Sequence, residues 1–170
     1  SLLHLGSWAR AKADGPAIAD LAWTRLAPWQ ELFARFFDEP RIHGHAARVT
    51  RLTLKQASER GARLGSEGAL LLGWIATRLG WKTARLGGTL RFQRPDGKNL
   101  VVEFGSVPRP EGVAPEAIAS VAVEAEADGL IVKGAMVREL GSGAADATAD
   151  ADVVKWTLSV GDAPPIEQSV

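Results

Sequence analysis

The feature that most constrains how this chain can fold is an aromatic-rich stretch at residues 20–38, DLAWTRLAPWQELFARFFD. After Pro28, its apolar residues recur three or four positions apart, a spacing that gives an α-helix one wide apolar face; they are Trp29, Leu32, Phe33, Phe36 and Phe37. Pro28 is placed like the first residue of a helix, where its missing N–H costs nothing. Pro40 ends the helix, because the residue before a proline disfavours the helical region. The stretch therefore predicts the main core helix.

A second helix is predicted over residues 66–80. Ser66 is a good N-cap, and Glu67 is favourably placed at the positive end of the helix dipole. The apolar residues cover nearly the whole circumference, which predicts a well-buried helix; they are Leu71, Leu72, Trp74, Ile75 and Leu79. Gly80 is the glycine expected just past a helix end, and Trp81 follows it.

Most of the remaining pattern is that of β-strands, predicted within residues 41–55 and at 89–94, 99–104, 118–127, 130–139 and 153–160. Two hairpins are predicted, one turning at Pro95-Asp96-Gly97-Lys98 and the other at Asp128-Gly129. No alternation of helices and strands follows residue 88, which argues against a doubly wound parallel sheet. The predicted fold class is therefore α+β, with a mainly antiparallel sheet of five or six strands and two main helices packed on one face.

The length of 170 residues predicts one ordinary domain. We expect a lead-in at residues 1–17, the domain at 18–160 and a tail at 161–170, with a low-complexity segment, GSGAADATADAD, at 141–152. The first residues, SLLHLGSWAR, resemble mid-protein sequence and no initiator methionine precedes them. We therefore expect this chain to be a piece of a longer protein whose N-terminal part is missing.

The net charge of zero conceals an asymmetry, because residues 41–104 carry a net charge of +8 and residues 105–170 carry −7. The two halves can neutralise each other across one sheet or complement the charge of a partner. Nucleic acid is not expected as a partner, since the basic half has little aromatic interleaving and the acidic half repels phosphate. No apolar run approaches the ~18 residues of a membrane span. The absence of cysteine excludes disulfide and thiol chemistry within this chain and fits a cytoplasmic location.

No catalytic or metal-binding arrangement emerges from the motifs. His43 and His45 would share a strand face, but the only other histidine is His4 and no carboxylate cluster accompanies the pair. Ser66 lies in LGSEG, where Leu64 replaces the first glycine that a nucleophile elbow requires. The carboxylates show no paired spacing of an acid/base couple. We therefore expect a non-enzymatic protein without cofactor or metal, and a binding or structural role.

Two stretches carry a resemblance to a known family: DLAWTRLAPWQELFARFFD at 20–38 and GSEGALLLGWIATRLGW at 65–81. They resemble the C-terminal domain of the OpcA family, bacterial assembly or effector proteins of glucose-6-phosphate dehydrogenase. The family pattern falls here on Asp20, Leu21, Trp23, Leu26, Trp29 and Asp38, and on Leu79, Gly80 and Trp81. Gln30 stands where family members usually have arginine, and this chain lacks the cysteines linked to redox control in some members.

The resemblance implies a non-catalytic protein that binds glucose-6-phosphate dehydrogenase, favours its active oligomer and so supports the oxidative pentose phosphate pathway. Because tryptophan and arginine carry much of the energy of protein interfaces, the candidate partner-binding residues are those near the two motifs: Trp23, Arg25, Trp29, Arg78 and Trp81.

An alternative remains open, in which the basic region at residues 41–94 senses a sugar phosphate or nucleotide. Its candidate ligand-binding residues are Arg48, Arg51, Arg85 and Arg91. A hydrolase or transferase is a third hypothesis, which no motif supports.

Overall fold

The computed structural model describes residues 18–42, 44–58, 61, 64–86, 89–111, 113–139, 153–161 and 163–169. Two α-helices lie in this part of the chain, α2 (Ile18–Asp38) and α3 (Ser66–Arg78), with two short 3-10 turns, η1 (Pro40–Ile42) and η2 (His45–Arg48). The strands are β1 (Val49–Ala57), β2 (Lys82–Leu86), β3 (Thr89–Gln93), β4 (Asn99–Val107), β5 (Ile118–Ala127), β6 (Leu130–Glu139), β7 (Val153–Val160) and β8 (Ile166–Ser169).

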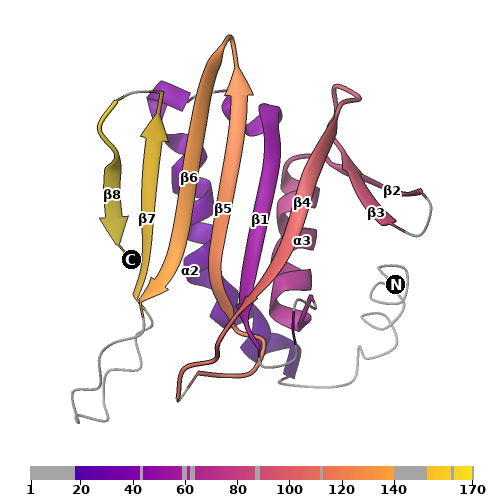
Figure 1. Cartoon of the computed structure of the whole chain (residues 1–170), viewed down its shortest axis with the longest axis vertical. Coiled ribbons are helices and arrows are strands. Elements are labelled where there is room, and N and C mark those ends of the chain that lie inside the picture. The colour runs from indigo at the N-terminus through magenta and orange to yellow at the C-terminus, as the bar shows by residue number, and fades with distance from the viewer. Residues whose placement is uncertain are drawn as a thin grey trace.

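The strands form one eight-stranded sheet in the order β2-β3-β4-β1-β5-β6-β7-β8. Every neighbouring pair is antiparallel except β1 and β4, which run parallel. Figure 1 shows both helices on one face of this sheet, with α2 behind β5 to β7 and α3 behind β1 and β4. The α+β class and the one-sided helix layer are confirmed.

The sheet differs from the predicted one in its number of strands and in the bounds of two segments. The sheet has eight strands instead of five or six, because β2 and β8 join it, and it is mixed because β4 lies beside β1 in parallel. The predicted tail at residues 161–170 contains β8, whose Ile166 is paired with Leu158 of β7. The predicted strand at residues 41–55 begins only at Val49, after two 3-10 turns. Residues 1–17 and 140–152 lie outside the described part of the chain.

Helix α2 supplies the largest part of the apolar core. Of the face predicted from the spacing, Trp29, Leu32, Phe33 and Phe36 are buried and Phe37 is partly buried. Leu26, one turn earlier, is buried with them. Pro28 is not at the first helical position as predicted, because α2 begins ten residues earlier. A proline inside a helix removes one backbone hydrogen bond and costs about 3 kcal/mol. Burial of the large residues around it, each contributing roughly 1.5–3 kcal/mol, offsets that cost.

Helix α3 begins at Ser66, with Gly65 as its N-cap residue, so the N-cap predicted at Ser66 is off by one position. The helix ends at Arg78, two residues before the predicted bound. The glycine predicted just past its end, Gly80, has a φ of 65°, a left-handed conformation that glycine adopts without strain. The N–H of Trp81 then donates to the carbonyl of Ala76 at 2.8 Å, closing the helix end. This turn directs the chain into β2 and packs the ring of Trp81 edge-on against Phe92 of β3.

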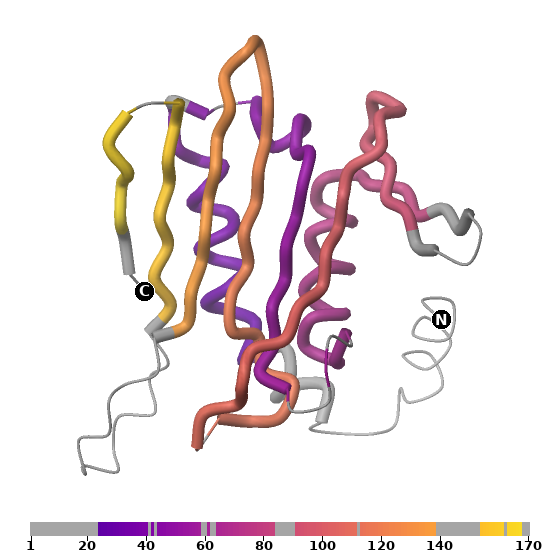
Figure 2. Tube along the Cα trace, viewed as in Figure 1, coloured from indigo at the N-terminus to yellow at the C-terminus, as the bar shows by residue number. Residues whose placement is uncertain are grey.

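The sheet face opposite the helices is not covered by any helix of the described chain, as the tube view in Figure 2 also shows. We call this face the open face. Along β1, β4 and β6 it carries Arg51, Lys55, Val101, Glu103, Ile131 and Val137, while the alternate residues point into the core. Neither described helix is long and apolar enough to cross a membrane.

Candidate functional site

The two family-like motifs meet where α2 approaches the first turn of α3. The Arg25 guanidinium lies 3.7 Å from the carboxylate of Glu67. The Arg25 side chain is 58% exposed and that of Glu67 only 9%. Glu67 also accepts a hydrogen bond from the backbone N–H of Ile118 at 3.3 Å. This contact joins both helices to β5, so the motifs contribute to the scaffold whatever else they do.

Two of the candidate partner-binding tryptophans are core residues. Trp29 is 1% exposed and Trp81 is 7% exposed, so neither ring is accessible on the surface of this chain by itself. Each falls on an apolar face that the helices and the sheet bury together. Arg78 is exposed and extends over the ring of Trp74, with its guanidinium carbon 5.8 Å from the ring centroid. The Arg25 side chain is exposed, and the side chain of Trp23 lies outside the described residues.

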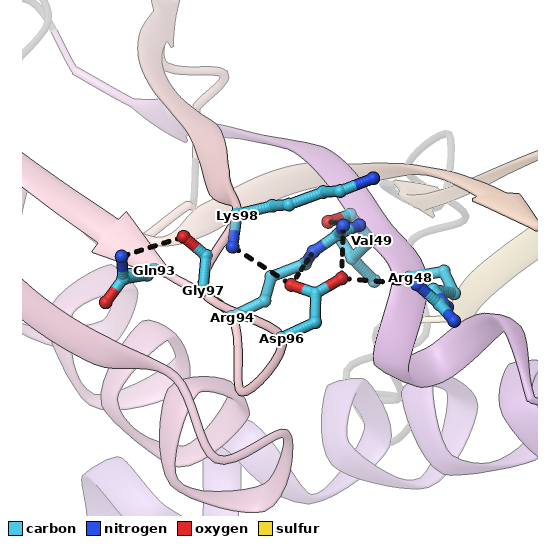
Figure 3. Close-up of polar contacts among 7 residues, drawn as sticks. All are labelled: Arg48, Val49, Gln93, Arg94, Asp96, Gly97 and Lys98. Carbon is cyan, nitrogen blue, oxygen red and sulfur yellow. Dashed lines mark hydrogen bonds and ion pairs between the residues drawn. The ribbon is translucent and has the colours of Figure 1, made fainter.

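A cluster of charged residues lies at the start of β1, beside the β3–β4 turn (Figure 3). Arg94 forms a two-pronged contact with the Asp96 carboxylate, in which its Nε donates at 3.1 Å and its Nη2 at 2.7 Å. The Nη1 of Arg94 donates to the carbonyl oxygen of Val49 at 3.2 Å. Arg48 approaches Asp96 from η2 at 3.3 Å. Arg94 is only 4% exposed, so its paired geometry connects the turn firmly to β1.

The surroundings of Asp96 lower the pKa of its carboxyl from the ordinary value of 3.8. The largest cause is the backbone N–H of Lys98, which donates to Asp96 Oδ1 at 3.1 Å. The guanidinium groups of Arg94 and Arg48 act in the same direction by hydrogen bonding and by charge. The carboxylate therefore stays ionised well below neutral pH and holds the two arginines in place.

Beside this cluster lies a cavity of about 360 Å³, which we call the basic cavity. Its basic lining consists of Arg48, Arg94 and Lys98, and two carboxylates, Glu126 and Asp128, face it from the β5–β6 hairpin. Thr50 and Asn99 add a hydroxyl and an amide. A cavity with cations on one side and hydrogen-bond acceptors on the other can hold a small polar molecule that carries both an anionic group and hydroxyls.

Of the four arginines predicted for ligand binding, only Arg48 lines the basic cavity. Arg51 lies on the open face, where it pairs with Glu103 at 2.5 Å and approaches Glu124 at 3.9 Å. Arg91 is exposed on β3 away from the cavity, and the side chain of Arg85 lies outside the described residues. The prediction missed Arg94 and Lys98, although the Pro95–Lys98 turn signal indicated that these residues flank a tight turn.

Only one member of the histidine pair, His45, lies among the described residues. His45 is buried, with its Nδ1 3.1 Å from the carbonyl oxygen of Ile42, and His43 lies outside the described residues. Across the part of the chain that the structure describes, no three histidine or carboxylate side chains come together as metal ligands.

A comparison with known families covers most of the scaffold. Residues 16–139, from the start of α2 to the end of β6, match the model of a family that is described as the C-terminal domain of the glucose-6-phosphate dehydrogenase subunit. The chain belongs to this family. The match covers both motifs and most of the sheet, so the resemblance predicted from the two motifs is confirmed.

Three relatives of this chain share the name "Putative OxPP cycle protein OpcA". The protein of Synechocystis is 42% identical over 63 residues, which is 37% of this chain, and that of Nostoc punctiforme is 38% identical over 65 residues, which is 38%. The protein of Synechococcus elongatus is 34% identical over 99 residues, or 54% of this chain. The matched regions span 12%, 13% and 21% of these relatives, so this chain corresponds to a small part of each.

Proposed function

We propose that this chain is a non-catalytic module that binds glucose-6-phosphate dehydrogenase, favours its active oligomer and supports the oxidative pentose phosphate pathway in the cytoplasm. The observation that carries the proposal is membership, over residues 16–139, in a family whose description names that dehydrogenase. The relatives are named as proteins of the OxPP cycle, which agrees with this assignment.

The fold supports a binding role. The motif residues Leu26, Trp29 and Trp81 are buried between the helices and the sheet, where they stabilise the scaffold. The open face, on the opposite side of the sheet, carries no helix in the described chain. A partner that binds one oligomeric state better than another shifts the population toward that state by its difference in affinity alone. A difference of about 1–3 kcal/mol is ordinary for such coupling.

The test is a titration of the glucose-6-phosphate dehydrogenase of the same organism with this chain. We expect the chain to change the apparent substrate affinity of the enzyme or the mass of its oligomer, as measured by steady-state kinetics and light scattering. The same titration with a dehydrogenase from an unrelated source serves as the specificity control. If a stoichiometric amount of folded chain leaves both measurements unchanged, the proposal is wrong.

A second candidate function is the binding of a sugar phosphate or nucleotide in the basic cavity. The observation that favours it is the convergence of Arg48, Arg94 and Lys98 on a cavity of about 360 Å³, a size within the range of small-molecule sites. A thermal-shift screen with phosphorylated sugars and nucleotides tests it, using Lys98→Ala as the variant expected to lose the shift. Lys82→Ala, at an exposed position of β2, is the matched control. No stabilisation of the wild type by any compound would reject this candidate.

A further inference from the structure

A second cavity lies at the opposite end of β1 from the basic cavity. It measures about 320 Å³ and is formed where the ends of β1, β4 and β6 and the start of β5 meet the proline-rich loop after β4. Figure 1 shows these strand ends and the loop at the lower edge of the sheet. Its walls are mainly apolar and include Val107, Pro110, Val113 and Ile118. We call it the lower cavity.

The two cavities differ in their charge. The basic cavity combines Arg48, Arg94 and Lys98 with Glu126 and Asp128. Among the described residues that line the lower cavity, two are cationic, Lys55 and Arg138, and none is an aspartate or glutamate. Apolar walls with charge of one sign complement a group that is apolar and negatively charged.

The shape of the lower cavity follows from one row of residues across the sheet. Lys55 of β1 is paired with Gly105 of β4 on one side and with Ser120 of β5 on the other, and Ser120 is paired with Val137 of β6. The two small residues leave room beside the two larger ones. A Cβ on Gly105 would lie 3.3 Å from the Cγ of Lys55, so the lysine stem lies across this glycine. The row thus places Lys55 and Val137 on either side of Ser120, with the lysine stem turned toward Gly105.

Arg138 links this cavity to the family motif. Its guanidinium carbon lies 5.7 Å from the ring centroid of Trp29, within the range of a cation–π contact. Arg138 alternates with Val137 along β6, so its guanidinium packs on Trp29 at the helix side of the sheet, while Lys55 supplies the cation on the open face. This contact connects the first motif to a surface feature that the motif itself does not form.

We propose that the lower cavity receives a segment of the partner protein in which a carboxylate lies next to an apolar side chain. This inference rests on the proposed function and takes the dehydrogenase as that partner. A protein segment fits better than a free small molecule, because the cavity is continuous with the open face through Val137, which is 46% exposed. A partner lying on this face would cover Val137 and could at the same time insert side chains into the lower cavity, as the anchor residues of interfaces do.

Two variants test the charge and the space of the lower cavity separately. Lys55→Glu reverses the charge at an exposed position, and Ser120→Phe fills the recess without changing charge. Lys82→Glu and Thr83→Phe introduce the same changes on β2, which does not line the cavity. The affinity of each folded chain for the dehydrogenase is measured by biolayer interferometry at low and high salt, with circular dichroism and thermal unfolding as controls for the fold.

We expect both cavity variants to weaken binding at least about tenfold and both β2 variants to change it less than about twofold. The loss caused by Lys55→Glu should shrink at high salt, because screening weakens exposed charge interactions. If the wild type binds and the folded cavity variants bind equally well, the lower cavity is not the docking site and the proposed function stands. If the folded wild type does not bind the dehydrogenase at all, the proposed function and this inference both fail.

Discussion

At the scale of single residues, Asp96 shows how one carboxylate organises a surface. It accepts hydrogen bonds from the Lys98 N–H and from Arg94, and Arg48 lies within ion-pair distance. Arg94 is buried, and a buried guanidinium without a partner is strongly destabilising. Asp96 therefore holds Arg94 and Arg48, two of the basic residues that line the basic cavity.

We expect Asp96→Asn to make the stability of the chain less dependent on acid pH. The pKa of Asp96 is lower in the folded chain than in the unfolded chain. The ionised carboxylate therefore stabilises the fold at pH values above 3.8, the ordinary pKa of the group. This contribution is lost as the pH falls through the folded pKa. Urea unfolding should show the wild type more stable than the variant at pH 7, with the difference closing below about pH 4. Equal stability at pH 7 would contradict this account.

The Arg25–Glu67 pair makes a second prediction at this scale. Arg25→Ala should destabilise the chain by about 1 kcal/mol or less, because the arginine is largely exposed and its pair is screened by solvent. A double-mutant cycle with Glu67→Gln should then show a coupling of about 0.5–1 kcal/mol in urea unfolding. A coupling of zero would mean that the 3.7 Å contact has no energetic role.

The same Arg25→Ala variant tests the partner-facing role predicted for this residue. A folded variant that no longer affects the dehydrogenase would support that role. An unchanged effect on the enzyme would leave Arg25 with a structural function only.

At the scale of elements, the position of α2 on the sheet depends on one glycine. A Cβ on Gly134 of β6 would overlap the ring of Phe36, so the ring packs directly on the strand backbone. Phe36 also meets Trp156 of β7 edge-to-face, with the ring centroids 6.3 Å apart. The helix therefore lies closest to the sheet where β6 carries no side chain.

Substitutions at two glycines should have opposite effects on stability. Gly134→Ala places a methyl group in the space of the Phe36 ring, and we expect it to destabilise the chain by about 1–3 kcal/mol. Gly73 of α3 has open space at its Cβ position, so Gly73→Ala should stabilise the chain by about 1 kcal/mol through helix propensity. Chemical unfolding of both variants measures the difference. A neutral Gly134→Ala would show that α2 can shift away from β6 without cost.

At the scale of the whole molecule, the sheet is completed by strands that are distant in sequence. β4 inserts beside β1 in parallel register, with Leu52 next to Val102 and Leu54 next to Phe104. At the far edge, β8 covers β7 and brings Ile166 against the core. The helix layer therefore rests on a sheet wider than the central hairpins alone would form.

Removal of residues 161–170 should expose the edge of β7. We expect a loss of about 1–2 kcal/mol in the free energy of unfolding, because the deletion removes strand hydrogen bonds and the partly buried Ile166. An uncovered strand edge also favours pairing between chains, so size-exclusion chromatography should show association that increases with concentration. A truncated chain that remains monomeric and fully stable would show that β8 has no role in closing the sheet.

The elements that could be predicted are those whose signal is local. The β5–β6 hairpin and β7 have the predicted bounds, and the C-terminal glycine of α3 is where the sequence placed it. The start of α2 was missed because Pro28 resembles a helix start, whereas buried apolar contacts keep the helix continuous through it. The candidate site was predicted only in part, since Arg48 lines the basic cavity whereas Arg51 is held on the open face by Glu103.

The sequence by itself determined the presence of both helices, the hairpins, the burial of most apolar faces and the membership of the family. These follow from periodicity, turn chemistry and motif spacing, which act over a few residues. Only the tertiary structure decided that β1 and β4 are parallel, that Trp29 lies beneath Arg138, and that Arg94 reaches the carbonyl of Val49. These contacts join residues more than forty positions apart, and a local pattern carries no information about which distant groups the packed core brings together.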